Sequence, residues 1–342
     1  MTIASFIHSH TNIQEKQITS VLQLIADGAT TPFIARYRKE ATGGLDEVQI
    51  GEIRDKAQQF DHISKRQETI IKAIDEQDKL SEELKHQVET TFDLNLLEDL
   101  YLPFKKKRQT KAEKARKNGL EGLAKILMAQ NNQDVVSAAQ RFVKGEVKSA
   151  EDALAGARDI IAEWINENIT LRTKIRTMYQ QHGTFQSKVV GIKKEEASKY
   201  SDYFDFKQHL RKVPSYRFLA IHRAAEEGFL RAKILVDEER VFNLCERFFV
   251  KKQNDAAEQI RVAYHDAFKR LIHPSMENEA MSEKKKEADL AAIKVFVDNL
   301  RQLLLAAPLA KKRILAIDPG YRSGCKVVCI DESGDLLTNE TI

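Results

Sequence analysis

Apolar residues recur three and four positions apart along most of the chain, which is the spacing that gives an α-helix one buried face. The first such group consists of Ile13, Ile18, Val21, Leu22 and Ile25. Gly28 is expected to end this helix. Thr31 and Pro32 then predict the cap and the first position of a short second helix, which Gly43 stops. The chain is therefore expected to open with two helices joined by a glycine turn.

The longest helical pattern begins at Asp46. Its repeating positions are Ile53, Ala57, Phe60, Ser64, Gln67, Ile71 and Ile74. This seam, with its two polar interruptions, predicts packing against an antiparallel helical partner. Ser81 is expected to cap a further helix. One long helix is predicted over residues 150–182, and Gly183 is expected to end it.

Two short runs of β-forming residues interrupt the helices. Residues 185–190 and 230–236 are expected to pair as a small ribbon. A helix begins near Pro214, and a second helix after a turn would make a helix-turn-helix; an ordinary helical hairpin is the favoured interpretation. The last helix is predicted over residues 281–305.

The pattern changes after residue 311. Residues 314–317 and 324–330 have the composition of strands, and a third strand begins at Asp335 after a polar turn. Three antiparallel strands cannot bury their own faces, so we expect them to begin a domain that the chain does not complete. Three regions follow from this: residues 1–190 and 191–311, both helical, and residues 312–342.

The composition agrees with a mainly helical protein. Of 342 residues, 42% are hydrophobic and 31% charged, and there are only 14 glycines and 6 prolines. The net charge of +4 permits contact with nucleic acid without requiring it. No apolar run reaches the roughly 20 residues that a membrane span needs, and the first residues lack a signal-peptide pattern. A cytoplasmic protein without membrane contact is expected.

Cofactor chemistry has no visible pattern in the sequence. The histidines and cysteines lack the spacing of zinc ligands. No glycine-rich loop ends in the Gly-Lys-Ser or Gly-Lys-Thr that a nucleotide-binding P-loop requires. We therefore expect no cofactor and no small-molecule substrate.

The densest positive segment lies between residues 105 and 117. Its cations are Lys105, Lys106, Lys107, Arg108, Lys111, Lys114, Arg116 and Lys117, opposed only by Glu113. Such a patch would neutralise phosphates and bind RNA or DNA without reading its sequence. A solvated helix start is the equally weighted alternative.

Two further groups of cations have both a functional and a structural interpretation. Arg36 and Arg38 precede a pair of glycines, where guanidinium groups can fork onto phosphate oxygens. The favoured alternative is that one of them pairs with a nearby carboxylate such as Glu40 or Asp46. Residues 284–286, three lysines between Glu283 and Glu287, predict an exposed helix face with local ion pairs.

Five segments of this sequence occur in a recognisable order. They cover residues 31–46, 97–112, 157–163, 212–217 and 317–326. Together they resemble the successive sequence blocks of the Tex family of transcription accessory proteins. Tyr216, Tyr321 and Ser323 depart from the usual family residues, each conservatively in size or chemistry.

The resemblance implies a fold and a function. The expected fold is mainly α, a multi-helix assembly with a small β-ribbon, followed by the first strands of a truncated α/β domain of the YqgF or RNase H-like type. The implied function is nucleic-acid binding in transcription rather than catalysis. The family's main RNA-binding module lies at the carboxyl end, beyond this chain, so these residues are expected to act mainly as a scaffold. Docking to the transcription machinery is an alternative role.

Asp318 has the most chemical character in the last region. In RNase H-like nucleases a carboxylate at the end of the first strand holds a divalent metal, and a metal pair drives phosphodiester cleavage. Asp318 is therefore the candidate metal ligand of a possible nuclease site, although Asp331 is expected at the opposite end of the strands. Arg322 and Lys326 flank the same turn and are candidate contacts to a nucleic-acid backbone.

Overall fold

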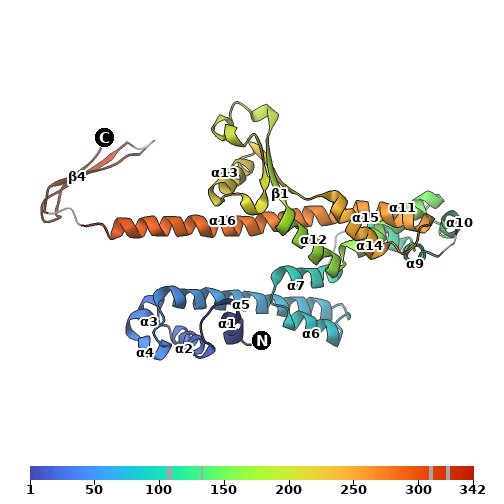
Figure 1. Cartoon of the computed structure of the whole chain (residues 1–342), viewed down its shortest axis with the longest axis horizontal. Helices are drawn as coiled ribbons and strands as arrows, with labels where there is room; N and C mark the ends of the chain where they lie inside the picture. The colour runs from blue at the N-terminus through green and yellow to red at the C-terminus, as the bar shows by residue number, and fades with distance from the viewer. Residues whose placement is uncertain (106–109, 132–133, 308–310, 321–323) are drawn as a thin grey trace.

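The protein is mainly helical, with two small antiparallel sheets (Figure 1). Its structure is a computed structural model that describes residues 1–105, 110–131, 134–307, 311–320 and 324–342. In these residues no helix is both long enough and apolar enough to cross a membrane. The expected fold class is confirmed.

Seven helices form the N-terminal part. They are α1 (Ile3–His10), α2 (Glu15–Ala26), α3 (Thr31–Tyr37), α4 (Lys39–Thr42), α5 (Glu47–Asp75), α6 (Glu82–Thr90) and α7 (Leu94–Tyr101). A short 3-10 turn, η1 (Leu102–Phe104), follows α7. Thr30 rather than Thr31 precedes the first residue of α3, so that prediction was displaced by one position. Ser81 caps α6 as predicted, by accepting a hydrogen bond from the Leu84 amide.

The long helix α5 begins where the sequence predicts it. The Asp46 side chain accepts a hydrogen bond from the Gln49 amide, and the Gln49 side chain accepts one from the Asp46 amide, which completes a capping box. Several short helices, including α1, α3 and α6, cover its apolar face in place of one long partner. The polar interruption at Gln67 is one reason why short helices, rather than one long helix, pack on α5. Its buried amide donates to the carbonyls of Val88, 2.9 Å away, and Thr91, 2.9 Å away, which end α6.

The central part contains most of the remaining helices. They are α8 (Lys111–Lys117), α9 (Glu121–Ala129), α10 (Val135–Gln140), α11 (Ala150–Asn166), α12 (Ile169–His182), α13 (Ser215–Glu226), α14 (Glu238–Phe249), α15 (Asp255–Ala267) and α16 (His273–Leu304), with a π-helical turn η5 (Phe268–Ile272) before α16. The single helix predicted over residues 150–182 was wrong, because it is two helices. Asn168 caps the second one by accepting from the Leu171 amide at 2.9 Å. Gly183 ends α12 as expected.

The first sheet has three antiparallel strands in the order β2-β1-β3. The strands are β1 (Thr184–Val189), β2 (Asp205–His209) and β3 (Leu230–Leu235), with short 3-10 turns at Gly191–Lys193, Ser198–Tyr203 and Leu210–Lys212. The predicted pairing of β1 with β3 is confirmed. β2 was missed, because only Phe206 among its five residues is strongly apolar. Helix α13 leads directly into β3, so no helix-turn-helix forms at Pro214.

Buried apolar residues form two separate cores. The N-terminal core extends from Phe6 to Leu100, and the central core extends from Ala112 to Ala288. The chain thus passes from one core to the other near residue 105. The division expected at residue 190 falls inside the central core, directly after β1.

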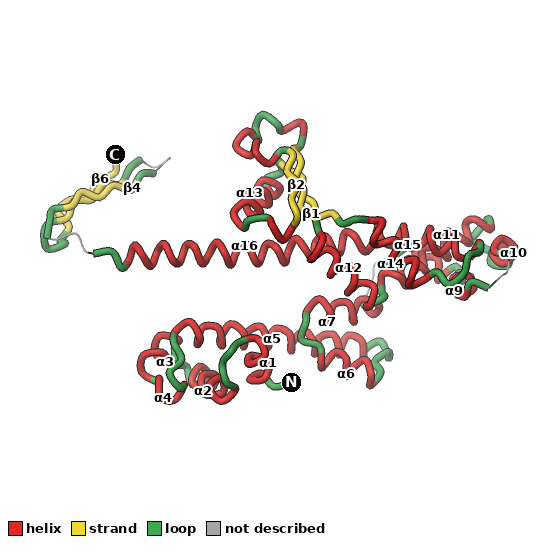
Figure 2. Tube along the Cα trace, in the orientation of Figure 1, coloured by secondary structure: helices red, strands yellow, loops and turns green. Residues whose placement is uncertain are grey.

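Helix α16 links the central core to the second sheet (Figure 2). Its first half packs against α12, α13 and β3, whereas its second half is exposed and includes Leu290, Phe296 and Leu303. Lys284 lies in the packed half and is 6% exposed, so the prediction of a fully exposed lysine face was wrong there. Lys284 lines a pocket together with Gln180 of α12 and Leu210, and its ammonium pairs with Glu287 at 3.0 Å.

The second sheet has the three strands that the sequence predicts. They are β4 (Ile314–Asp318), β5 (Lys326–Ile330) and β6 (Leu336–Thr341), in the order β4-β5-β6. The neighbouring strands are antiparallel. Residues such as Leu315, Ile317 and Leu336 remain exposed on them, as expected for strands without a covering layer.

We predict that Phe185→Ala destabilises the central core by about 3–5 kcal/mol, because the protein then lacks a fully buried ring that lies 4.9 Å from the Phe218 ring. Urea unfolding followed by the fluorescence of Trp164, the single tryptophan, would measure it. Lys188→Ala, on the exposed side of the same strand, is the control and should change stability by less than about 0.5 kcal/mol. Equal effects of the two substitutions would contradict the assignment of strand faces.

Candidate functional site: basic segments and a buried clamp

Four of the five described cations of the basic segment, residues 105–117, lie beside carboxylates. Four pairs are formed: Lys105 with Glu98, Lys114 with Glu146, Arg116 with Glu163 and Lys117 with Glu113. Lys111 is exposed and has no ion pair in the described part of the chain. Lys106, Lys107 and Arg108 lie outside the described residues. Much of the positive charge expected here is therefore countered locally.

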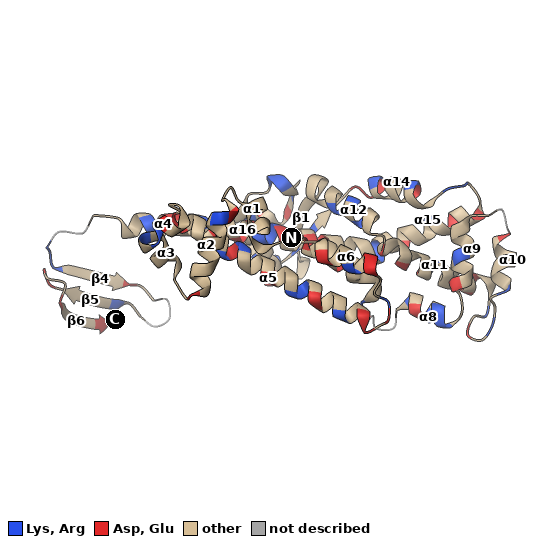
Figure 3. Cartoon of the chain, turned by 90° about the horizontal axis from the view of Figure 1, so that it is seen from below, with Lys and Arg blue, Asp and Glu red and all other residues tan. Residues whose placement is uncertain are grey.

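Arg36 and Arg38 are both exposed, at the end of α3 and just after it. The Arg38 guanidinium lies 5.4 Å from the centre of the Phe33 ring. Within the described ranges neither arginine forms the ion pair with Glu40 or Asp46 that the structural alternative predicts. Figure 3 places α3 and α8 toward opposite ends of the elongated molecule. The structure therefore does not bring Arg36 and Arg38 together with the cations of the 105–117 segment.

Asp318 ends β4 and is exposed. The strand register places it opposite Lys326 of β5. Asp331 lies at the other end of the strands, where its Oδ1 accepts from the amides of Ser333 and Asp335, at 2.8 and 2.9 Å. No three His, Cys, Asp or Glu side chains among the described residues are grouped to hold a metal. Among the described residues no second carboxylate lies beside Asp318, and no reaction is assigned to it. Its role as a metal ligand stays a prediction; Arg322 lies outside the described residues.

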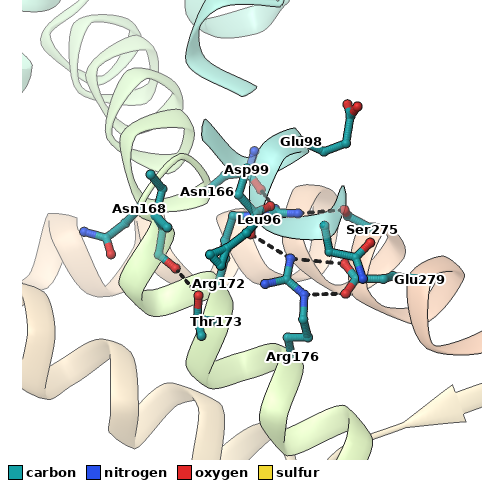
Figure 4. A network of polar contacts seen from close by, with 12 residues as sticks. Leu96, Glu98, Asp99, Asn166, Asn168, Arg172, Thr173, Arg176, Ser275 and Glu279 are labelled. Atoms are coloured by element: carbon teal, nitrogen blue, oxygen red, sulfur yellow. Dashed lines mark hydrogen bonds and ion pairs between the residues drawn. The ribbon is translucent and has the colours of Figure 1, made fainter. Parts of the chain in front are cut away.

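A buried polar network lies between the two cores (Figure 4). Asp99 of α7 is 2% exposed. Its Oδ1 accepts from Arg172 Nε at 2.5 Å, and its Oδ2 accepts from Arg176 Nη2 at 2.6 Å. Arg176 also donates through two nitrogens to the carboxylate of Glu279 on α16. We call Asp99, Arg172, Arg176 and Glu279 the clamp.

Further hydrogen bonds hold the Arg172 side of the clamp. Arg172 donates to Asn166 Oδ1 and to Ser275 Oγ, both at 3.0 Å. Burial alone lowers the pKa of Arg176, but its hydrogen bonds to Glu279 and Asp99 outweigh burial and hold the pKa above its usual value. Burial raises the pKa of Glu279, and Arg176 offsets part of that rise. Four helices, α7, α11, α12 and α16, thus meet at one charged centre.

A cleft of about 660 Å³ adjoins the clamp, and both cores line it. Asn95 of α7 crosses the cleft by donating to Glu283 Oε1 at 2.7 Å. The clamp was not predicted from the sequence. Two signals were present: a carboxylate, Asp99, inside an apolar helix, and arginines four residues apart, Arg172 and Arg176, which share one face of a helix.

The fold and the clamp define a class of protein. It is a mainly helical protein of two cores joined through a buried network of charges, with a separate set of antiparallel strands after its longest helix. Three family models match the chain in order. They are the Tex-like protein N-terminal domain over residues 1–75, the Tex central region-like model over 130–296 and the Tex protein YqgF-like domain over 312–342. The chain belongs to the Tex family.

Curated relatives agree with this assignment. The chain is 38% identical to the transcriptional accessory protein Tex of Neisseria gonorrhoeae, over 98% of this chain and 45% of that protein. It is 35% identical to protein tex of Bordetella pertussis, over 95% of this chain and 43% of the relative. It is 27% identical to the human S1 RNA-binding domain-containing protein 1, over 98% and 35% respectively. The chain spans less than half the length of these relatives.

We predict that Asp99→Asn lowers the free energy of unfolding by about 3–5 kcal/mol, because two buried guanidinium groups are left without their shared anion. Glu98→Gln is the matched control. Its carboxylate is 43% exposed and pairs with Arg66 and Lys105, so its removal should cost about 1 kcal/mol or less. Urea unfolding, read by circular dichroism and by Trp164 fluorescence, would compare them. A destabilisation no larger for Asp99→Asn than for Glu98→Gln would show that the clamp does not hold the cores.

Proposed function

We propose that this protein is a nucleic-acid-binding transcription accessory factor, in which residues 1–342 act mainly as a helical scaffold. The name of the gonococcal relative supports the link to transcription, and that of the human relative supports contact with RNA. The clamp is the observation that carries the scaffold role. A buried carboxylate shared by two arginines favours one arrangement of the two cores, since any other arrangement leaves charges without partners.

The basic segment is proposed as a secondary contact to the backbone of RNA or DNA. Its described ion pairs do not oppose this role. Lys105 lies 3.9 Å from Glu98 and is 57% exposed, and exposed pairs contribute little stability. Such a cation can exchange its carboxylate for a phosphate. Lys111, exposed two residues after the segment that is not described, adds a cation without an ion pair in the described chain.

Arg36, Arg38 and Lys326 are proposed as weaker contacts of the same kind. Each is exposed and free of described ion pairs, so each can approach a phosphate. Arg36 and Arg38 lie far from the basic segment along the molecule. A single short nucleic acid is therefore not expected to reach all of these cations. The cytoplasmic location stays a prediction.

A salt titration tests the basic segment. We expect the chain to bind single-stranded RNA and duplex DNA with an affinity that falls as salt rises. Replacing residues 105–108 with alanine should lower the slope of log affinity against log salt by roughly 0.7–0.9 for each phosphate that the segment no longer neutralises. The control variant replaces four exposed cations elsewhere, Lys16, Lys65, Lys72 and Lys269. An unchanged affinity of the 105–108 variant would exclude the basic segment as a contact. The scaffold role would then be the only one of the two that remains.

A further inference from the structure

The first sheet has one apolar face and one charged face. The sequence alternates along β1, so Phe185 and Ser187 are buried whereas Lys188 is exposed. The register of the neighbouring strands continues this division onto β2 and β3. The exposed charged side chains on the outer face are Lys188, Lys207, Arg231, Lys233 and Asp205. We call this surface the basic sheet face; it carries four cations and one carboxylate.

The register places like charges side by side on this face. Lys188 of β1 lies directly opposite Arg231 of β3 on one side and opposite Asp205 of β2 on the other. Lys207 and Lys233 both lie opposite Gln186, one on each side of it. Like charges in directly opposed positions destabilise a sheet. Asp205 offsets part of this repulsion at Lys188. In the described part of the chain, however, none of the four cations forms an ion pair.

Other cations of the central core form ion pairs with carboxylates. Arg261 pairs with Glu246 at 2.7 Å, and Arg270 pairs with Asp159 at 2.9 Å. The cations of the basic sheet face share a small area without such partners. A cluster with a net positive charge at fixed positions is the electrostatic pattern of a surface that receives an anionic polymer.

The basic sheet face is also held rigidly. Behind it, the Phe185 ring packs against the Phe218 ring of α13. Glu277 of α16 accepts a hydrogen bond from the Ile234 amide at 3.0 Å, which fixes β3 to the long helix. Figure 1 shows the sheet with α13 standing out from the elongated body, so a large partner can approach it. Rigid presentation lowers the entropy cost of binding.

We propose that the basic sheet face binds the phosphate backbone of double-stranded DNA. The proposal rests on the nucleic-acid-binding role proposed above and adds a site that was not predicted from the sequence. Alternate residues of a strand are roughly 7 Å apart, and neighbouring strands are about 4.8 Å apart, so the cations form a compact grid. Gln186, between Lys207 and Lys233, supplies an amide that can donate to a phosphate oxygen.

The side chains of the basic sheet face favour a double strand over a single strand. Proteins that bind single strands without sequence preference combine cations with aromatic side chains on which bases stack. The outward positions of the three described strands carry no Phe, Tyr or Trp, because Phe185 and Phe206 lie on the inner face. The face therefore relies on charge. A double helix presents one phosphate for about every 1.7 Å of its axis, which suits such a surface.

The test compares two triple variants of the full chain. K188Q/K207Q/K233Q removes three cations from the basic sheet face, and K16Q/K65Q/K72Q removes three exposed lysines from the N-terminal helices. Binding to a duplex of mixed sequence, about two helical turns long, is measured by fluorescence anisotropy over a range of salt. We expect the affinity of the first variant to fall at least about tenfold at low salt, with a salt slope lower by roughly 2–3. The control should stay within about twofold of the original chain.

Three outcomes would overturn the proposal in distinguishable ways. If the original chain binds the duplex and K188Q/K207Q/K233Q binds as well as the control, the face is not a contact, while the proposed nucleic-acid role stands. If the original chain binds neither duplex nor single strand, the nucleic-acid role of these residues fails as well. If the affinity of the variant for a single strand falls equally, the choice of a duplex is wrong. K188R/K207R/K233R keeps the charge and should restore binding, which separates an effect of charge from an effect on the fold.

Discussion

The carboxylate of Asp99 is the group on which the arrangement of the two cores depends. Removing it from water is costly, and that cost is offset only while Arg172 and Arg176 both donate to it. Arg176 is in turn shared with Glu279, and Arg172 with Asn166 and Ser275. A shift of either core would leave buried charges without partners. The clamp therefore specifies the orientation of the two cores more than it raises the total stability. A well-packed apolar contact of the same size could provide comparable stability without specifying one orientation.

Helix α16 connects the clamp to the first sheet and to helix α12. Ser275 and Glu279 contact the arginines of the clamp, while Glu277, between them in sequence, fixes β3 of the first sheet. His273, one turn earlier, is hydrogen-bonded to Tyr179 of α12. About two turns of one helix thus position the N-terminal core, helix α12 and the sheet relative to one another.

The charges of the molecule fall into two kinds. The clamp and pairs such as Arg116 with Glu163 join cations to buried carboxylates, whose positions are fixed. The basic sheet face keeps its cations at the surface, in register with one another and without ion pairs in the described chain. A net charge of +4 conceals this division, because paired and unpaired cations count equally in it. Position, rather than number, separates a structural cation from one that is available to a partner.

The sequence alone determined most of the local structure and the family. Helical periodicity, the cap at Asp46 and the strands after residue 311 depend on neighbours a few residues apart, so they can be read without the fold. The break at Asn168 and the strand β2 were missed, because the hydrophobic pattern is weak at both places. Packing against the rest of the central core decides the structure there. Residues 99, 172 and 279 are separated by long stretches of chain, and only the tertiary structure brings them together. The same holds for Lys188, Lys207 and Arg231: each is an ordinary surface cation in the sequence, and strand register alone makes them one face.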